Sequence, residues 1–453
     1  MPSPRITLWR DRSIRFSMGA AGTASSVLFG VIRNKWLATH LQASGLGILG
    51  QVNSGQAWLG SLAGMGLSLP VARVVGASSG TADEELARRT VWTSLSLVGA
   101  GALLVATAGL LFAGPISAAI LGTPAHAQLV RISMLGVSGI ALQSVLLGLF
   151  AGRSDLKANL SLSLSGSLAA LLVTLALVPR WGLAGAVLGG SVLWPVGIAA
   201  ALLLHNRSYA RIFAPIPRPF FNPALARSIL AVGAAALTMS LVDIGTMLSV
   251  RVHYVRVNGF EANGLLQAAL ALSQMVGALF SGYLSNYAFG KVSAAPSAVA
   301  IRAYTQRQWT PLMMFATLVV AVVMVASGPL LHLLYSSRFD PARPLMAWML
   351  VGEFCRIGMN AWAVGALPVG GARLWAPIGL STATGLAISY LFLSRAGVGT
   401  LSLPLSYVGA GLFSLVFAWL TMARAGVGPS WRNAGLVLAA AAGLAALAWW
   451  VTR

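Results

Sequence analysis

Charged side chains are scarce in this sequence. Only 9% of its 453 residues are Asp, Glu, Lys or Arg, whereas 57% are hydrophobic and the mean hydropathy is +0.81. Soluble domains usually carry about 25% charged residues. The composition therefore excludes a fold surrounded by water and predicts an integral membrane protein.

The chain also has few residues that could perform covalent chemistry. Its single cysteine, Cys355, excludes an intramolecular disulfide. The five histidines lack the close His/Cys spacing of a zinc site, and no Gly-rich loop ends in the Lys-Ser/Thr of a P-loop. We therefore expect no catalytic residue, no metal, no cofactor and no enzymatic activity.

Acidic residues are the scarcest charged type, with nine against 30 Lys and Arg and a net charge of +21. In a soluble chain this excess would suggest nucleic acid, but in a membrane protein the placement of basic residues indicates topology instead. If the apolar segments alternate in direction, one side collects most of the basic residues: Arg5, Arg10, Arg12, Arg15, Arg88, Arg89, Arg153, Lys157, Arg207, Arg211, Arg218, Arg227, Lys291, Arg302 and Arg307. Because such residues concentrate in the cytoplasm, we predict a cytoplasmic N-terminus, with residues 1–16 as a basic arm, and no nucleic-acid partner.

Long apolar runs recur almost to the last residue. A helix of roughly 20 apolar residues crosses about 30 Å of hydrocarbon, and the alternating pattern of a membrane β-barrel is absent. The predicted fold is an all-α polytopic bundle of twelve transmembrane helices with a thirteenth at the end. The predicted spans are 17–37, 45–75, 90–114, 128–151, 158–179, 181–204, 228–250, 263–290, 309–335, 344–369, 372–394, 400–423 and 433–450.

An internal repeat indicates a duplicated half. Arg33 and Arg251, Gly47 and Gly264, and Gly182 and Gly399 each lie about 217 residues apart in similar surroundings. We therefore predict two pseudo-symmetric six-helix halves related by an axis along the membrane normal, an architecture typical of transporters. The predicted parts are the arm 1–16, a half at 17–204, a cytoplasmic linker at 205–227, a half at 228–424 and an extra helix within 425–453.

Three charges lie well away from the ends of their apolar spans, where each costs about 2.5–3.5 kcal/mol on insertion scales. Glu353 and Arg356 are three residues apart and so share a helix face; they form either a self-neutralising pair or a site for substrate or protons. Asp243 has no cation nearby in the sequence. It either bonds to a neighbouring span or takes part in ion coupling.

A basic group marks the ends of spans one and seven, on the side where positive charge is otherwise sparse. Its members are Arg33, Lys35, Arg251, His253 and Arg256. If the two spans are equivalent helices, these cations line one central cavity that attracts an anion. The alternative is that they are interfacial anchors whose heads reach the lipid headgroups.

Three stretches carry a resemblance to a known family. "NKWLATHLQASGLGILGQVNS", with Lys35, Ala38, Gly45, Gly47, Gly50 and Gln51, resembles the helix 1–2 signature of Wzx-type translocases of lipid-linked oligosaccharides, in the multidrug/oligosaccharidyl-lipid/polysaccharide exporter superfamily. "EANGLLQAALALSQMVGALFSGYLSNYAFGKVS", with Gln267 and Tyr287, is similar to its helix 8. "LLYSSRFDPARPLMAWMLVGEFCRIGMNAWAVGALPVGGAR" resembles its helix 9–10 connection, including Glu353, Phe354 and Arg356, and Arg251 matches an Arg that commonly ends helix 7.

The resemblance implies a flippase of the bacterial inner membrane. It would move an undecaprenyl-diphosphate-linked oligosaccharide to the periplasmic leaflet by alternating access, for O-antigen-like surface polysaccharide. Arg33, Lys35, Arg251 and Arg256 would then bind the anionic diphosphate. The partners implied are the lipid-linked oligosaccharide, the bilayer, and the polymerase and chain-length proteins of polysaccharide assembly.

Three other functions fit parts of the sequence. A cation-coupled drug or metabolite exporter of the same superfamily would share the fold, but it favours an acidic cavity. A membrane glycosyltransferase or polymerase acting on the same lipids would need a larger outer loop. A scaffold that transports nothing would have no use for Asp243, Glu353 or Arg356 inside the membrane.

Overall fold

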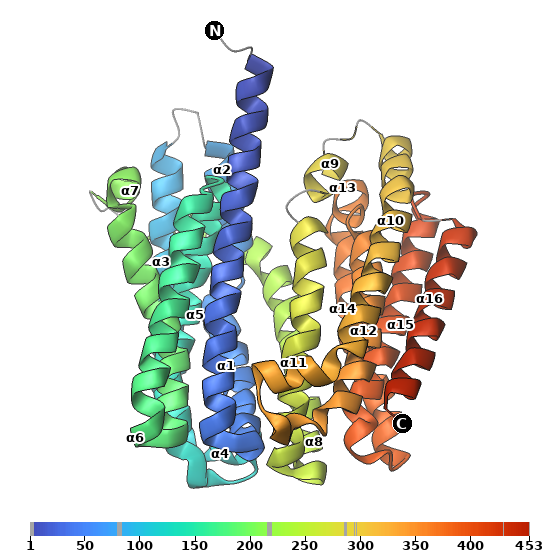
Figure 1. The fold of residues 1–453 in the computed structure, drawn as a ribbon. Coiled ribbons are helices and arrows are strands. Elements are labelled where there is room, and N and C mark those ends of the chain that lie inside the picture. The colour runs from blue at the N-terminus through green and yellow to red at the C-terminus, as the bar shows by residue number, and fades with distance from the viewer. Residues whose placement is uncertain are drawn as a thin grey trace. The chain divides into compact units, whose positions relative to one another are not determined.

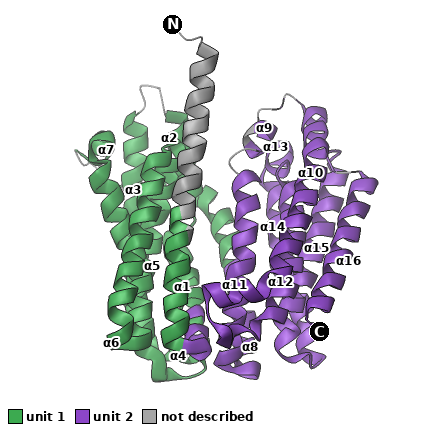
Figure 2. Cartoon of the chain, viewed as in Figure 1, with its two compact units in different colours: residues 1–41, 51–241 green, residues 42–50, 242–453 purple. Residues whose placement is uncertain are grey.

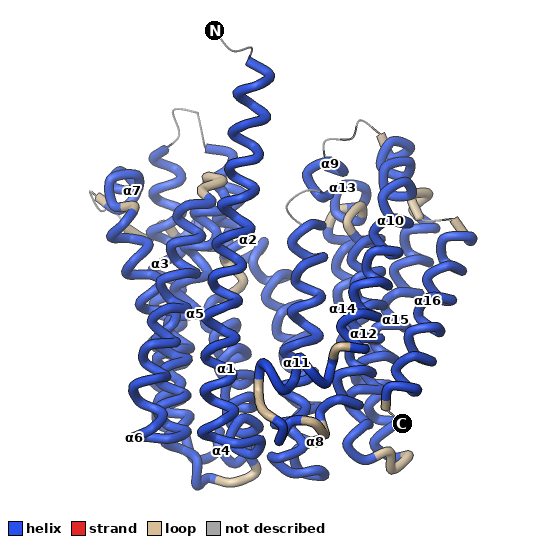
Figure 3. Tube along the Cα trace, in the orientation of Figure 1, coloured by secondary structure: helices blue, strands red, loops and turns tan. Residues whose placement is uncertain are grey.

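The structure is a computed structural model in which residues 4–78, 84–214, 220–284, 288–293, 295, 297–428 and 430–452 are described. The described residues form helices joined by short connections, without a strand among them (Figures 1 and 3). The α-helices are α1 (Pro4–Gly64), α2 (Ser68–Ser78), α3 (Glu84–Leu111), α4 (Ala113–Leu121), α5 (Ala127–Gly152), α6 (Leu156–Leu204), α7 (Asn206–Phe213), α8 (Pro223–Tyr283), α9 (Phe289–Ser293), α10 (Ala298–Val325), α11 (Ser327–Leu334), α12 (Ala342–Ala363), α13 (Ala366–Gly370), α14 (Ala372–Arg395), α15 (Ser402–Arg424) and α16 (Trp431–Val451). Short 3₁₀ turns lie at Pro124–His126, Ser337–Phe339 and Gly399–Leu401.

Apolar helices of membrane-spanning length dominate the described part of the chain. Eight of the described helices are long and apolar enough to cross a membrane, or nine if the bent pair Leu28–Gly64 and Ser68–Ser78 forms one span. The prediction of an all-helical membrane protein is therefore confirmed. The number of twelve or thirteen spans and the six-plus-six division stay predictions, because several of these helices contain a break.

The breaks recur at a constant spacing. Residues with positive φ interrupt the helices at Gln42 in α1, Gly182 in α6 and Gly259 in α8, and Ser154, Gly371 and Gly399 have positive φ between helices. These six residues form three pairs, 42 with 259, 154 with 371 and 182 with 399, and in each pair the two numbers differ by 217. The backbone therefore repeats where the sequence repeats, which supports a duplicated chain.

The chain divides into two compact units (Figure 2). Unit 1 comprises residues 1–41 and 51–241. In it, α5 packs against α2, α3 and α6, and the buried core includes Leu67, Val98, Val145 and Phe150. Ile229, near the beginning of α8, belongs to the same core, so the first part of α8 is built into unit 1.

Unit 2 comprises residues 42–50 and 242–453. Its centre is α12, which packs against α10, α15 and α16. Glycines allow α12 and α15 to approach each other closely, since a Cβ at Gly411 of α15 would lie 2.7 Å from the Gly352 carbonyl oxygen of α12. Trp309 and Trp362 stack between α10 and α12 with their ring centroids 5.2 Å apart.

The unit boundaries differ from the predicted division at residues 205–227. Part of that predicted linker is the helix α7, whose Tyr209 hydroxyl donates to Asp155 at 2.9 Å. The chain passes from one unit to the other inside α1 and inside α8. Residues 42–50 of α1 belong to unit 2, and the residues of α8 up to 241 belong to unit 1. Of the other predictions, Tyr287, Arg218, Arg453 and the side chains of Arg5, Arg10, Arg12 and Arg15 lie outside the described residues.

The breaks at Gln42 and Gly259 make a matched pair for substitution. Both backbones have positive φ with ψ near 180° (58°, −172° and 84°, 172°), a conformation that only glycine adopts without strain. We expect Gly259→Ala to lower stability by about 1–3 kcal/mol and Gln42→Gly to raise it. Thermal unfolding of the purified protein measures both. Gly443→Ala in α16, with open space around its Cβ and no positive φ, is the control. If Gly259→Ala melts at the same temperature as this control, the backbone at residue 259 is not strained by a side chain.

Candidate intramembrane polar sites

Arg251 lies in a buried polar cluster of unit 2. Its side chain is 3% exposed, and its Nε and Nη2 both donate to Asn263 Oδ1, at 3.3 and 3.1 Å. The Asn263 amide in turn donates to the Gly47 carbonyl oxygen at 2.7 Å. A cation of α8 is thus connected through one side chain to the segment 42–50.

This segment contacts α8 through glycines. A Cβ at Gly47 would lie 2.0 Å from the Phe260 carbonyl oxygen, and one at Gly264 would lie 1.7 Å from the Ala43 carbonyl oxygen. Because residues 43 and 260, and 47 and 264, have the repeat spacing, the two contacts are equivalent under exchange of the repeats. The contact between the segment 42–50 and α8 is therefore locally two-fold symmetric. Only glycine fits at positions 47 and 264.

Arg33 has different surroundings, in unit 1. It is half-buried, and its Nε donates to Thr174 Oγ1 of α6 at 3.1 Å. Gly190 leaves space for its guanidinium, since a Cβ at that position would lie 2.9 Å from Arg33 Nη2. Lys35 and Arg256 are exposed. Of the four predicted headgroup ligands, the structure therefore buries Arg251, partly buries Arg33 inside its own unit, and leaves the other two on the surface.

The second site joins the three charges predicted inside the spans. The Tyr407 hydroxyl of α15 donates to Glu353 Oε2 at 2.6 Å, and Arg356 Nη1 donates to the Tyr407 oxygen. Arg356 Nη1 also lies 3.6 Å from Glu353 Oε2, and its guanidinium is 5.4 Å from the centroid of the Tyr407 ring. Asp243 of α8 interacts electrostatically with Arg356. Arg356 lies 113 residues after Asp243, so the sequence did not show this interaction.

A glycine makes room for the buried carboxylate. Glu353 is 5% exposed, and a Cβ at Gly277 of α8 would lie 1.8 Å from Glu353 Oε1. The site therefore brings the Glu353 carboxylate and the Arg356 guanidinium of α12 together with the Tyr407 phenol of α15. Gly277 of α8 leaves space for the carboxylate. Such a buried network can hold or release a proton, or it can fix the packing of three helices.

Solved membrane transporters share this fold. A MATE-family multidrug resistance transporter of the MOP superfamily matches with a TM-score of 0.73 and 14% identity, over 88% of this chain and 94% of that one. A MOP-superfamily transporter from Pyrococcus furiosus matches with a TM-score of 0.68 and 16% identity, over 91% and 95% of the two chains. The chain has the fold of these transporters. The lipid II flippase MurJ matches with a TM-score of 0.75 and 11% identity, over 95% of this chain and 91% of that one.

Two curated relatives of the chain are flippases. It is 27% identical to the lipid III flippase of Escherichia coli K12 over 390 residues, which are 83% of this chain and 86% of the relative. The lipid III flippase of Shigella flexneri matches with the same values. No protein-family model matches this chain.

Three residues of these sites were not predicted from the sequence. Asn263 had a usable signal, since it is an amide at the beginning of the predicted span 263–290, twelve residues after Arg251. Tyr407 is a tyrosine within the predicted span 400–423, and a buried tyrosine hydroxyl needs a partner. Gly277 had no usable signal, because nothing in the sequence distinguishes it among 50 glycines.

Proposed function

We propose that this protein is a flippase that moves an undecaprenyl-diphosphate-linked oligosaccharide across the bacterial inner membrane, for assembly of a surface polysaccharide. The observation that carries the proposal is the relationship to lipid III flippases over 83% of the chain. The fold is compatible with it, because both MurJ and the MOP-superfamily transporters have that fold. In this proposal the N-terminus is cytoplasmic and the protein is a transporter without enzymatic activity.

The transport step needs no covalent chemistry. A saccharide headgroup cannot enter hydrocarbon without losing its hydrogen bonds to water, so the protein must supply a polar path. Arg33 in unit 1 is half-buried and Arg251 in unit 2 is buried, and guanidinium forms strong charge-assisted hydrogen bonds with diphosphate. The hydrocarbon chain of the substrate would stay in the bilayer.

Arg251 has a second role in this account. Asn263 accepts hydrogen bonds from Nε and Nη2 of Arg251 and itself donates to the Gly47 carbonyl oxygen. A diphosphate that competes for Arg251 would therefore loosen the hold of Asn263 on the segment 42–50. Substrate binding and rearrangement of this segment are then coupled through one residue.

Neutral substitutions test the proposal in cells. Arg251→Ala, and Arg33→Ala combined with Lys35→Ala, should abolish export of the lipid-linked glycan, whereas Arg251→Lys should keep part of the activity because a point charge remains. The assay is complementation of a flippase-deficient strain. Membrane level and melting temperature are measured in parallel, and Arg395→Ala, an exposed arginine that ends α14, serves as control. Normal surface glycan in the neutral variants would remove the phosphate-binding role.

A further inference from the structure

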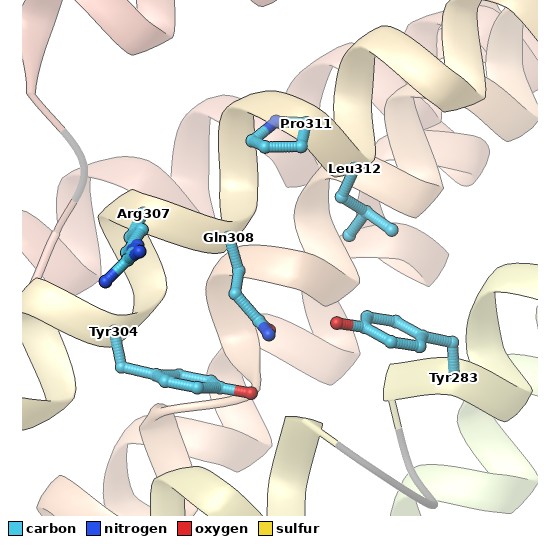
Figure 4. Close-up of a pocket in the computed structure, with 6 residues that line it drawn as sticks. All are labelled: Tyr283, Tyr304, Arg307, Gln308, Pro311 and Leu312. Carbon is cyan, nitrogen blue, oxygen red and sulfur yellow. The ribbon is translucent and has the colours of Figure 1, made fainter.

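Unit 2 contains a pocket outside both polar sites. It lies at the end of α8 and beside α10, with a volume of about 530 Å³. That volume falls within the range of roughly 300–1,000 Å³ found for small-molecule sites. Its lining residues are Tyr283, Tyr304, Arg307, Gln308, Pro311 and Leu312 (Figure 4).

Polar groups converge in this pocket. Figure 4 shows the hydroxyls of Tyr283 and Tyr304 and the amide of Gln308 pointing into the same space, with Arg307 beside Tyr304. Tyrosine hydroxyls and an amide donate to and accept from sugar hydroxyls, and arginine binds phosphate in a bidentate manner. The two tyrosine rings add flat, partly apolar surfaces of the kind that a sugar ring packs against.

An exposed apolar strip leads away from the pocket. On α10, Met314, Phe315, Leu318 and Val322 are all more than half exposed, and they follow Pro311 at helical spacing on one face. On α8, Leu279 is 68% exposed one turn before Tyr283. A ligand with a polar head in the pocket and a hydrocarbon chain on this strip would cover both surfaces at once.

We propose that this pocket binds the diphosphate-saccharide headgroup of the lipid-linked substrate, with the hydrocarbon chain along the strip. This assignment rests on the proposed function. An ordinary anionic phospholipid would need only Arg307, whereas the two tyrosines and Gln308 match a larger head rich in hydroxyls. The pocket is a binding site separate from Arg251, and it would hold the substrate at one end of unit 2.

Photo-crosslinking identifies what occupies the pocket. A benzoyl-phenylalanine at Leu312 is introduced into the full chain, which is reconstituted in nanodiscs of phosphatidylethanolamine and phosphatidylglycerol with undecaprenyl diphosphate carrying a disaccharide. We expect an adduct with the mass of the lipid-linked saccharide. A phospholipid adduct alone, equal labelling by undecaprenyl phosphate without sugar, or no lipid adduct would each overturn the assignment.

Variants show whether the lining residues hold the ligand. Arg307→Ala and Tyr304→Ala should each reduce the adduct at least fivefold, and Tyr304→Phe should reduce it less because the ring remains. Arg302→Ala is the control, since Arg302 is an exposed arginine of the same helix that does not line the pocket. Labelling of every variant at the control level, with unchanged melting temperature, would overturn the assignment. If Tyr304→Ala does not fold, Tyr304→Phe and Arg307→Ala decide the question.

The outcome also separates this proposal from the proposed function. Transport of the lipid-linked saccharide by the wild-type chain without an adduct rejects the pocket and leaves the function standing. An adduct without any transport by the wild-type chain supports the pocket and rejects the function.

Discussion

Gly264→Ala should be among the most damaging single substitutions in this chain. The added Cβ would lie 1.7 Å from the Ala43 carbonyl oxygen, far inside van der Waals contact. Since the obstacle is backbone, no side-chain rotation relieves it, and the segment 42–50 must move away from α8. Overpacking costs typically about 1–3 kcal/mol and sometimes more, and we expect the upper end here because the Asn263–Gly47 hydrogen bond is lost as well.

The measurement is thermal unfolding of the purified full chain, together with export in the complementation assay. Gly47→Ala should behave alike, because its Cβ would lie 2.0 Å from the Phe260 carbonyl oxygen. Gly282→Ala is the control on the same helix, since no atom lies within 4 Å of its Cβ. Control-like melting and normal export for Gly264→Ala would show that the segment does not pack on α8 as described.

Arg356→Ala should be the second large loss. It removes the cation beside Glu353, which is 5% exposed, and leaves the carboxylate with the hydrogen bond from Tyr407. Removing one partner of a buried ion pair costs about 3–5 kcal/mol, and the 30% exposure of the Arg356 side chain places the expected loss near the lower value. The double variant Glu353→Gln/Arg356→Ala should recover part of it, because no uncompensated charge remains.

Export measured on the same variants decides between the two interpretations of this site. If the pair only fixes helix packing, the double variant should regain export together with its melting temperature. If the pair handles substrate or protons, export should stay absent in the double variant although stability returns. Full export and wild-type melting in Arg356→Ala would show that neither interpretation holds.

The fold class could be predicted from the sequence because membrane insertion depends on composition and on the length of apolar runs. The repeat was also visible, since Gly47 and Gly264 or Gly182 and Gly399 keep their spacing. The residues where the helices break were only partly visible. Gly182 and Gly259 are natural break points, but Gln42 adopts its positive φ only because tertiary packing imposes it.

The sites were harder to predict because they depend on contacts between distant segments. The i, i+3 spacing identified Glu353 and Arg356, whereas Tyr407 lies 54 residues after Glu353 and joins them only through helix packing. Arg33 and Arg251 lie 218 residues apart, one more than the backbone repeat of 217, so Arg33 corresponds to Val250. In the structure Thr174 binds Arg33 and Asn263 binds Arg251. Side-chain partners follow from tertiary structure, which the repeat alone does not specify.

Flipping by the purified protein in liposomes tests the proposed transport directly. A fluorescent undecaprenyl-diphosphate oligosaccharide is placed in both leaflets, and a membrane-impermeant quencher reports the fraction that becomes accessible after the outer leaflet has been bleached. We expect transfer by the wild-type chain, loss of transfer in Arg251→Ala, and wild-type transfer in Arg395→Ala. Transfer by the wild-type chain no faster than in protein-free liposomes, or equal transfer with and without Arg251, would contradict the proposal.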